Sequence, residues 1–214
     1  YPNLTRGPGF LGAKDGYLYL TDTEAGPRGL ISPPDVDYTR FQKRQDLLGK
    51  LRKSYIDRGN QDDQVKNYDV GIEASMRLAG SSFMSVFDLE KEKSSLRESY
   101  GGEFGQRCLL ARRLVQSGVR FVEVSLDGWD THYDNFATVQ RLCGTLDRPW
   151  SALLQDLKDR NLLESTLVVW MGEFGRTPVI NPQVGRDHYP KAWSVVLGGG
   201  GIRGGTVVGR TSDD

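Results

Sequence analysis

Residues 166–188 read TLVVWMGEFGRTPVINPQVGRDH, and they join an apolar run, an acidic turn, a loop and one of the two histidines of the chain. The apolar run at residues 166–171 contains the β-branched Val168 and Val169, which predicts a strand buried on both faces, as in a parallel sheet. Glu173 then follows the carboxyl end of this strand. Because ligands collect at that edge of an open α/β sheet, the stretch predicts where a functional site lies.

A second strand is predicted upstream, at residues 119–126, where VRFVEVSL alternates apolar and polar residues. Helical sequence at residues 136–161 joins the two strands, and Pro149 is predicted to divide it by beginning a new helix. The new helix carries an apolar stripe that is predicted to face the sheet, formed by Trp150, Leu153, Leu154 and Leu157. Further strands are predicted at residues 193–197 and 206–208. The strand–helix–strand order is that of a right-handed βαβ unit, so we predict an α/β protein with a mostly parallel sheet.

The first part of the chain has a different character. Residues 1–37 are rich in Gly and Pro and are predicted to form loops. Apolar residues at three- and four-residue steps then predict a helical hairpin made of residues 38–57 and 62–78. We therefore predict a loop-rich and helical segment at residues 1–100 and an α/β core at residues 101–214.

The composition disfavours several classes of protein. Lys plus Arg and Asp plus Glu number 28 each, so no net charge would attract nucleic acid, and nucleic-acid binding is not expected. No apolar run in the sequence is long enough to span a bilayer. Cys108 and Cys143 lack CxxC spacing, which argues against a disulfide framework or a thiolate metal site. The run KEKSSLRE at residues 91–98 alternates in charge and is predicted to be a solvated helical face without function.

A glycine run near the end of the chain imitates a nucleotide-binding loop. Gly199, Gly201 and Gly204 match the GxGxxG pattern. Dinucleotide-binding loops lead into a helix whose amino terminus faces the phosphates, whereas this run leads into the apolar TVVG of residues 206–209. We therefore predict a flexible hairpin connection.

Carboxylates and imidazoles gather at the predicted strand ends. Both histidines of the chain lie beside aspartates, in the segments DGWDTH and RDH. Oxygen and nitrogen donors of this kind bind divalent metals, and Asp130 and His132, two residues apart on an extended segment, point the same way. The candidate metal ligands, which we expect to converge at one sheet edge, are Asp127, Asp130, His132, Glu173, Asp187 and His188. The alternative is that both histidines are surface residues paired with nearby acids.

Two arginines lie in the loop between the strand and the second histidine. Arg176 and Arg186 are candidate substrate-binding residues, because paired guanidinium hydrogen bonds hold phosphate or sulfate. They are equally suited to form salt bridges with Glu173 and Asp187.

Several motifs of the chain point to one family: GWDTH, a long helix, LVVWMGEFGRTP, GRDHYP and WSVVLGGGGIRGGTVVGRT. From about Leu109 onward they resemble, almost motif for motif, domain-of-unknown-function family 1501 (DUF1501) of bacterial exported proteins. That family is similar to the alkaline phosphatase and sulfatase superfamily, which implies a three-layer α/β/α sandwich with a mostly parallel sheet. The resemblance also implies a divalent metal (zinc, manganese, calcium or magnesium), a small anionic ester substrate and a periplasmic or exported location.

The resemblance also assigns the candidate ligands to positions of the superfamily's two-metal site. Asp127 or Asp130, together with His132, resembles the Asp and the His that follow one strand. Glu173 takes the place of the Asp in an Asp-His pair, and His188 resembles the last His of the site.

Two departures from the superfamily pattern affect the expected function. Phe174 stands where the His of the pair would be, which removes a ligand of the second metal. The nucleophile would precede Tyr1, so we expect an internal or C-terminal piece of a longer protein, with its catalytic residues unknown. The resemblance implies a metal-dependent hydrolase of phosphate or sulfate esters. The alternative is a catalytically degenerate member that binds a ligand or partner, since a lost ligand can abolish chemistry while the fold persists.

Overall fold

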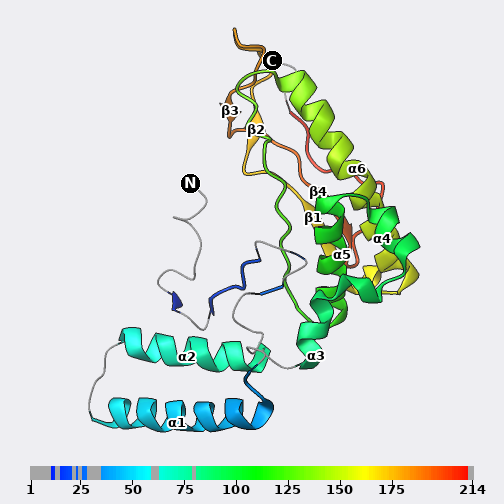
Figure 1. Cartoon of the computed structure of the whole chain (residues 1–214). Coiled ribbons are helices and arrows are strands. Elements are labelled where there is room, and N and C mark those ends of the chain that lie inside the picture. The colour runs from blue at the N-terminus through cyan, green and yellow to red at the C-terminus, as the bar shows by residue number, and fades with distance from the viewer. Residues whose placement is uncertain are drawn as a thin grey trace. The chain divides into compact units, whose positions relative to one another are not determined.

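The structure is a computed structural model that describes residues 11–12, 15–20, 23, 26–27, 35–58, 63–78 and 81–211 (Figure 1). The chain divides into two compact units, Tyr1–Asp88 and Leu89–Asp214. All candidate site residues belong to the second unit.

The first unit contains the predicted pair of helices. Helix α1 spans Tyr38–Asp57 and helix α2 spans Asp63–Leu78, which confirms both helix predictions. The side chain of Asp37 caps α1 by accepting a hydrogen bond of 2.7 Å from the backbone N–H of Arg40. The two helices lie side by side (Figure 1), and Arg52 of α1 approaches Asp69 of α2 to 3.1 Å, so the chain forms the predicted hairpin. The short helix α3, Ser81–Met84, and the 3-10 turn η3, Ser85–Phe87, follow.

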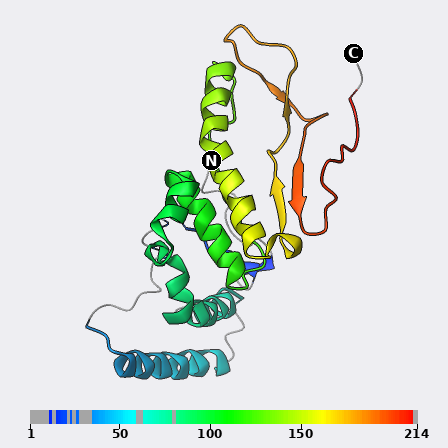
Figure 2. The ribbon, with the colours of Figure 1, turned by 90° about the vertical axis from the view of Figure 1, so that its right-hand side faces the viewer.

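The second unit is built mainly from three packed helices and two 3-10 turns. The helices are α4 (Ser94–Tyr100), α5 (Glu103–Gln116) and α6 (Asn135–Asp159), and the turns are η4 (Leu89–Lys91) and η5 (Leu163–Ser165). Helix α6 packs along α4 and α5 (Figure 2). The predicted division at Pro149 is wrong, because α6 continues through this residue. Leu142 before Pro149 and Leu157 after it are both buried, so packing against the neighbouring helices keeps both segments in one helix.

A buried network of charged groups joins these helices. The guanidinium of Arg112, with 1% of its surface exposed, donates to Asp156 at 2.8 Å and lies 2.8 Å from Glu92. The hydroxyl of Tyr100 also donates to Asp156, at 2.9 Å. Burial by itself raises the pKa of Glu92, but hydrogen bonds from Arg112 and Arg113 outweigh it and hold that pKa below its usual value. The prediction that residues 91–98 form only a solvated face is therefore wrong at Glu92.

The strands pair in a way that overturns the predicted fold class. Strand β1, Leu167–Trp170, pairs antiparallel with β4, Val196–Gly199, so that Leu167 lies opposite Gly199. Strand β2, Gly175–Arg176, pairs antiparallel with β3, His188–Tyr189. Within the described residues these two-stranded sheets are the β structure, apart from one isolated bridge. The prediction of a three-layer α/β/α sandwich with a mostly parallel sheet is therefore wrong.

The reason lies in the connections between the apolar segments. A parallel pair needs a crossover that returns the chain to the same end of the sheet, and between β1 and β4 the chain forms only the β2–β3 pair and loops. Residues 119–126 are not assigned as a strand, although half-buried and exposed positions alternate over most of the segment. Residues 206–208 also remain unpaired, with Val207 93% exposed. Only Val168 of β1 is buried, so burial on both faces is wrong as well.

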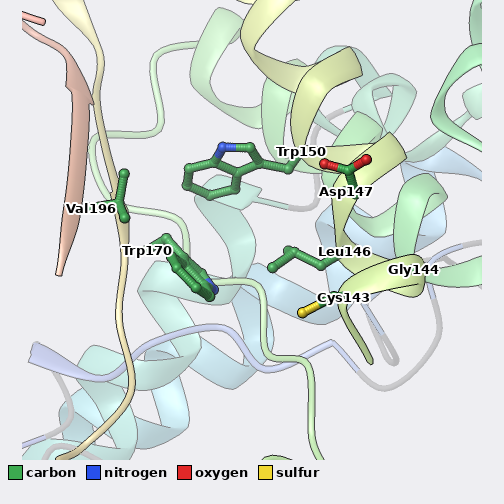
Figure 3. A pocket seen from close by; sticks show the side chains of 7 residues that line it. All are labelled: Cys143, Gly144, Leu146, Asp147, Trp150, Trp170 and Val196. Carbon is green, nitrogen blue, oxygen red and sulfur yellow. The ribbon is translucent and has the colours of Figure 1, made fainter. Parts of the chain in front are cut away.

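A tryptophan cluster lies between α6 and the sheet of β1 and β4. Trp150 of α6 contacts Trp170 of β1 edge to face, with ring centroids 6.5 Å apart, and Trp129 contacts the same ring at 6.4 Å. Trp150, Trp170 and Val196 line a cavity of about 450 Å³ together with residues of α6 (Figure 3). This part of the predicted apolar stripe does face a sheet. No helix among the described residues is long and apolar enough to cross a membrane.

Candidate metal centre

The candidate metal centre forms where two loops meet near the amino end of α6 (Figures 1 and 2). Residues 117–134 connect α5 to α6 and carry Asp130 and His132, while residues 177–187 connect β2 to β3. Register in the β2–β3 pair sets Arg176 opposite His188. Backbone hydrogen bonds of 2.9–3.1 Å join the loops, from Arg186 to Thr131, from Asp134 to Gln183 and from Asn135 to Val184.

Three donor atoms converge in this centre. Asp130 Oδ1 lies 3.0 Å from His188 Nε2 and 3.1 Å from His132 Nε2, and the two Nε2 atoms are 3.0 Å apart. Asp130, His132 and His188 are thus a group that could hold a metal ion. Ligand bonds of about 2.0–2.2 Å place neighbouring donors roughly 3–3.5 Å apart around one ion. The donor spacing and the donor types therefore fit a single divalent cation.

Asp187 contacts the opposite side of the His132 ring. Its Oδ1 lies 2.8 Å from His132 Nδ1. An ionised carboxylate can only accept, so Asp187 favours a proton on Nδ1, and with a cation between the three donors the lone pair of Nε2 would be free to bind it. Asp187, a predicted ligand, therefore lies beside the candidate ligand His132 and outside the group of three donors.

Asn181 is a residue of the centre that the sequence reasoning missed. Its side-chain amide donates to the backbone carbonyl of His132 at 2.8 Å and to Asp187 at 3.2 Å. The dipeptide Asn181-Pro182 is a recognised turn signal, and that signal could have drawn attention to the position. The Asn-Pro signal predicts only a turn, because no local pattern indicates a contact with a residue 49 positions away.

Two other predicted ligands do not join the cluster. Asp127 is exposed and lies outside the described group of donors that could share an ion. Glu173 is also outside this group, and its carboxylate lies 3.7 Å from the guanidinium of Arg176. The prediction relied on a common sheet edge to gather these residues, and the structure forms the centre from two loops instead.

The two candidate substrate-binding arginines occupy different positions. The guanidinium of Arg176 lies 2.6 Å from Asp130 Oδ1. That of Arg186 donates to the backbone carbonyls of Thr177 at 2.6 Å and Pro178 at 3.1 Å. Arg176 is thus at the centre, while Arg186 braces the loop between β2 and β3.

Phe174 occupies the space beside the last histidine. Its ring centroid is 4.4 Å from that of His188, at an interplanar angle of 50°. The guanidinium of Arg176 lies over the ring of Phe174, 5.7 Å from its centroid. An apolar ring therefore packs against the imidazole of His188.

The electrostatic environment keeps the carboxylates of the centre ionised. Hydrogen bonds with His188 and then Arg176 lower the pKa of Asp130 below its usual value. A hydrogen bond with His132, followed by one with Asn181, lowers the pKa of Asp187 in the same way. Ionised carboxylates beside imidazole nitrogens favour the binding of a cation.

A comparison with models of protein families shows to which family the chain belongs. The family model described as protein of unknown function (DUF1501) matches residues 1–214. The chain belongs to the DUF1501 family. No curated protein and no solved structure matched this DUF1501 chain. The description of the DUF1501 family names no activity.

Proposed function

We propose that the protein is a metal-dependent hydrolase of phosphate or sulfate esters. The observation that carries the proposal is the triangle of Asp130 Oδ1, His132 Nε2 and His188 Nε2, with sides of 3.0–3.1 Å. Two imidazoles and one carboxylate are a ligand set of catalytic zinc sites, which keep a further position open.

The donor chemistry narrows the range of ions. Calcium and magnesium prefer oxygen ligands, whereas two of the three donors here are imidazole nitrogens. Among zinc, manganese, calcium and magnesium, zinc is therefore the preferred ion. A divalent cation bound here would polarise the ester and lower the pKa of water in the open position.

Arg176 supports an anionic substrate. Its guanidinium lies beside Asp130 at the edge of the centre, with 18% of the side chain exposed. A cation that binds to Asp130 competes with this ion pair, and the guanidinium is then available to a phosphate or sulfate group through paired hydrogen bonds. The choice of an ester also rests on the resemblance to the alkaline phosphatase and sulfatase superfamily, as does the proposal of export.

A second candidate function is ligand binding without turnover. The observation that favours it is the ring of Phe174, which packs against His188 in place of a further metal ligand. Glu173 pairs with Arg176 and is separate from the three donors, so residues for a second ion do not come together among those described. Chemistry that needs two ions would be lost in such a protein while the fold persists.

Elemental analysis and ester turnover on the same samples test the proposal. We expect about one zinc ion per chain in protein purified without chelator, and hydrolysis of an aryl phosphate or aryl sulfate that stops on adding EDTA. Asp130→Asn should lose both the ion and the activity, while Asp127→Asn, a matched change at an exposed acid outside the cluster, should keep both. Bound zinc without turnover of either ester would favour the ligand-binding candidate. No bound metal in the wild type would refute both the metal centre and the hydrolase.

A further inference from the structure

We propose that Asn181 and Asp187 are positioning residues that fix the ring of His132 in the orientation and tautomer a metal ion requires. The inference rests on the proposed metal centre and deepens it. It changes the role of Asp187 from predicted ligand to holder of a ligand, and it gives a role to Asn181, which has no signal of function in the sequence.

Asn181 uses the full hydrogen-bonding capacity of its amide group. Its Nδ2 donates to His132 O at 2.8 Å and to Asp187 Oδ1 at 3.2 Å. Its Oδ1 accepts from the backbone N–H groups of Gln183 at 3.0 Å and Gly185 at 2.8 Å. An amide offers two N–H donors and one oxygen with two lone pairs, and all four are satisfied here. A carboxylate of the same shape cannot donate, so Asp cannot replace this residue.

Asp187 connects Asn181 to the histidine ring. Its Oδ1 accepts from Asn181 at 3.2 Å and lies 2.8 Å from His132 Nδ1. Its backbone is fixed as well, because its N–H donates to Thr177 Oγ1 at 3.1 Å and its carbonyl accepts from Thr177 N at 2.9 Å. The carboxylate therefore approaches the ring from a braced loop. Such carboxylate–histidine contacts set the tautomer and raise the basicity of the ligand nitrogen.

The two contacts act on different parts of His132. Asn181 holds the backbone carbonyl and Asp187 holds the ring, so the position of the residue and the rotation of its imidazole are both determined. Nε2 then points toward Asp130 and His188, at 3.1 and 3.0 Å. None of these positioning contacts involves the metal ion, so the geometry of the ligand is set by the protein itself.

The test measures zinc affinity by competition with a chromophoric chelator, together with the tautomer of His132 by nitrogen-15 NMR of the zinc-bound protein. We expect a proton on Nδ1 in the wild type. Asp187→Ala should lower zinc affinity by about 10- to 100-fold. Asp187→Asn keeps a hydrogen-bond acceptor of the same shape and should lose about tenfold or less. Asp127→Asn is the matched control and should change neither quantity.

The same measurements distinguish the roles of Asn181 and Asp187. Asn181→Ala should lower affinity to a similar degree, and Asn181→Asp should do no better than Ala because its carboxylate would repel Asp187. If Asp187 were itself a ligand, Asp187→Asn would fail as badly as Asp130→Asn, and that outcome would overturn the inference. A proton on Nε2 in the wild type would overturn it as well. A failure of the metal centre itself is recognised separately, as absence of zinc binding by the wild type in the competition measurement.

Discussion

Gly185 is the position where a small change should damage the centre most directly. A Cβ atom at this residue would lie 1.9 Å from the carbonyl oxygen of His132 and 2.5 Å from the backbone nitrogen of Tyr133. Ordinary van der Waals contact begins at 3.4 Å, so the two backbones must separate by 3.4 minus 1.9, or about 1.5 Å. Metal and catalytic sites tolerate errors of only about 0.5 Å in the placement of their groups. Gly185→Ala should therefore displace His132 from the other donors.

The expected result is a zinc affinity lowered by at least about tenfold, comparable with the loss of a residue that holds a ligand. Gly172→Ala is the matched control from the same region, because its nearest neighbour would be Phe174 O at 3.9 Å. Both variants are measured by chelator competition and by thermal unfolding, which reports any general loss of structure. A Gly185→Ala protein that binds zinc as tightly as Gly172→Ala would refute the close approach of the two loops.

Three further predictions concern the helical part of the second unit. Asp156→Ala should destabilise the protein by about 3–5 kcal/mol in urea unfolding, because it breaks a buried ion pair and leaves Arg112, with 1% of its surface exposed, with Glu92 as its remaining carboxylate partner; a loss below about 1 kcal/mol would contradict the network. Because folding lowers the pKa of Glu92, the ionised carboxylate should stabilise the folded state fully above about pH 4.5, and this stabilisation should be lost as the pH falls through the lowered pKa. Glu92→Gln should therefore make the free energy of unfolding depend less on pH in the acid range. The same pH dependence in the variant and the wild type would count against this prediction. Cys143 is exposed and should react with a thiol reagent in the native protein, whereas burial, which raises the pKa of Cys108 to about 12, should protect that thiol until unfolding; equal labelling rates would refute this assignment.

Local patterns in the sequence were sufficient to predict the helices. The three- and four-residue spacing of apolar side chains located α1 and α2, because this spacing is the period of an amphipathic helix. The same kind of reasoning failed at Pro149, where packing of Leu142 and Leu157 keeps one helix intact. It failed again for the sheet, since period-two alternation at residues 119–126 describes an extended segment and cannot specify its partner.

The candidate site was predictable as a set of residue types and only partly as a geometry. The sequence drew attention to Asp130, His132 and His188 because the chain has just two histidines and both follow or precede aspartates. It could not exclude Asp127 from the cluster or identify Asn181, because those outcomes depend on how two distant loops meet. The loops are joined by backbone hydrogen bonds, which leave no mark on side-chain identity.

The central claim is that Asp130, His132 and His188 share one divalent ion, and anomalous diffraction at the zinc absorption edge tests it most directly. Crystals of the protein grown with stoichiometric zinc should show one strong anomalous peak at about 2.0–2.2 Å from Asp130 Oδ1, His132 Nε2 and His188 Nε2. Asp187 should lie outside bonding distance of that peak, with its carboxylate on His132 Nδ1. A peak elsewhere in the molecule, or no peak at the three donors, would contradict the account.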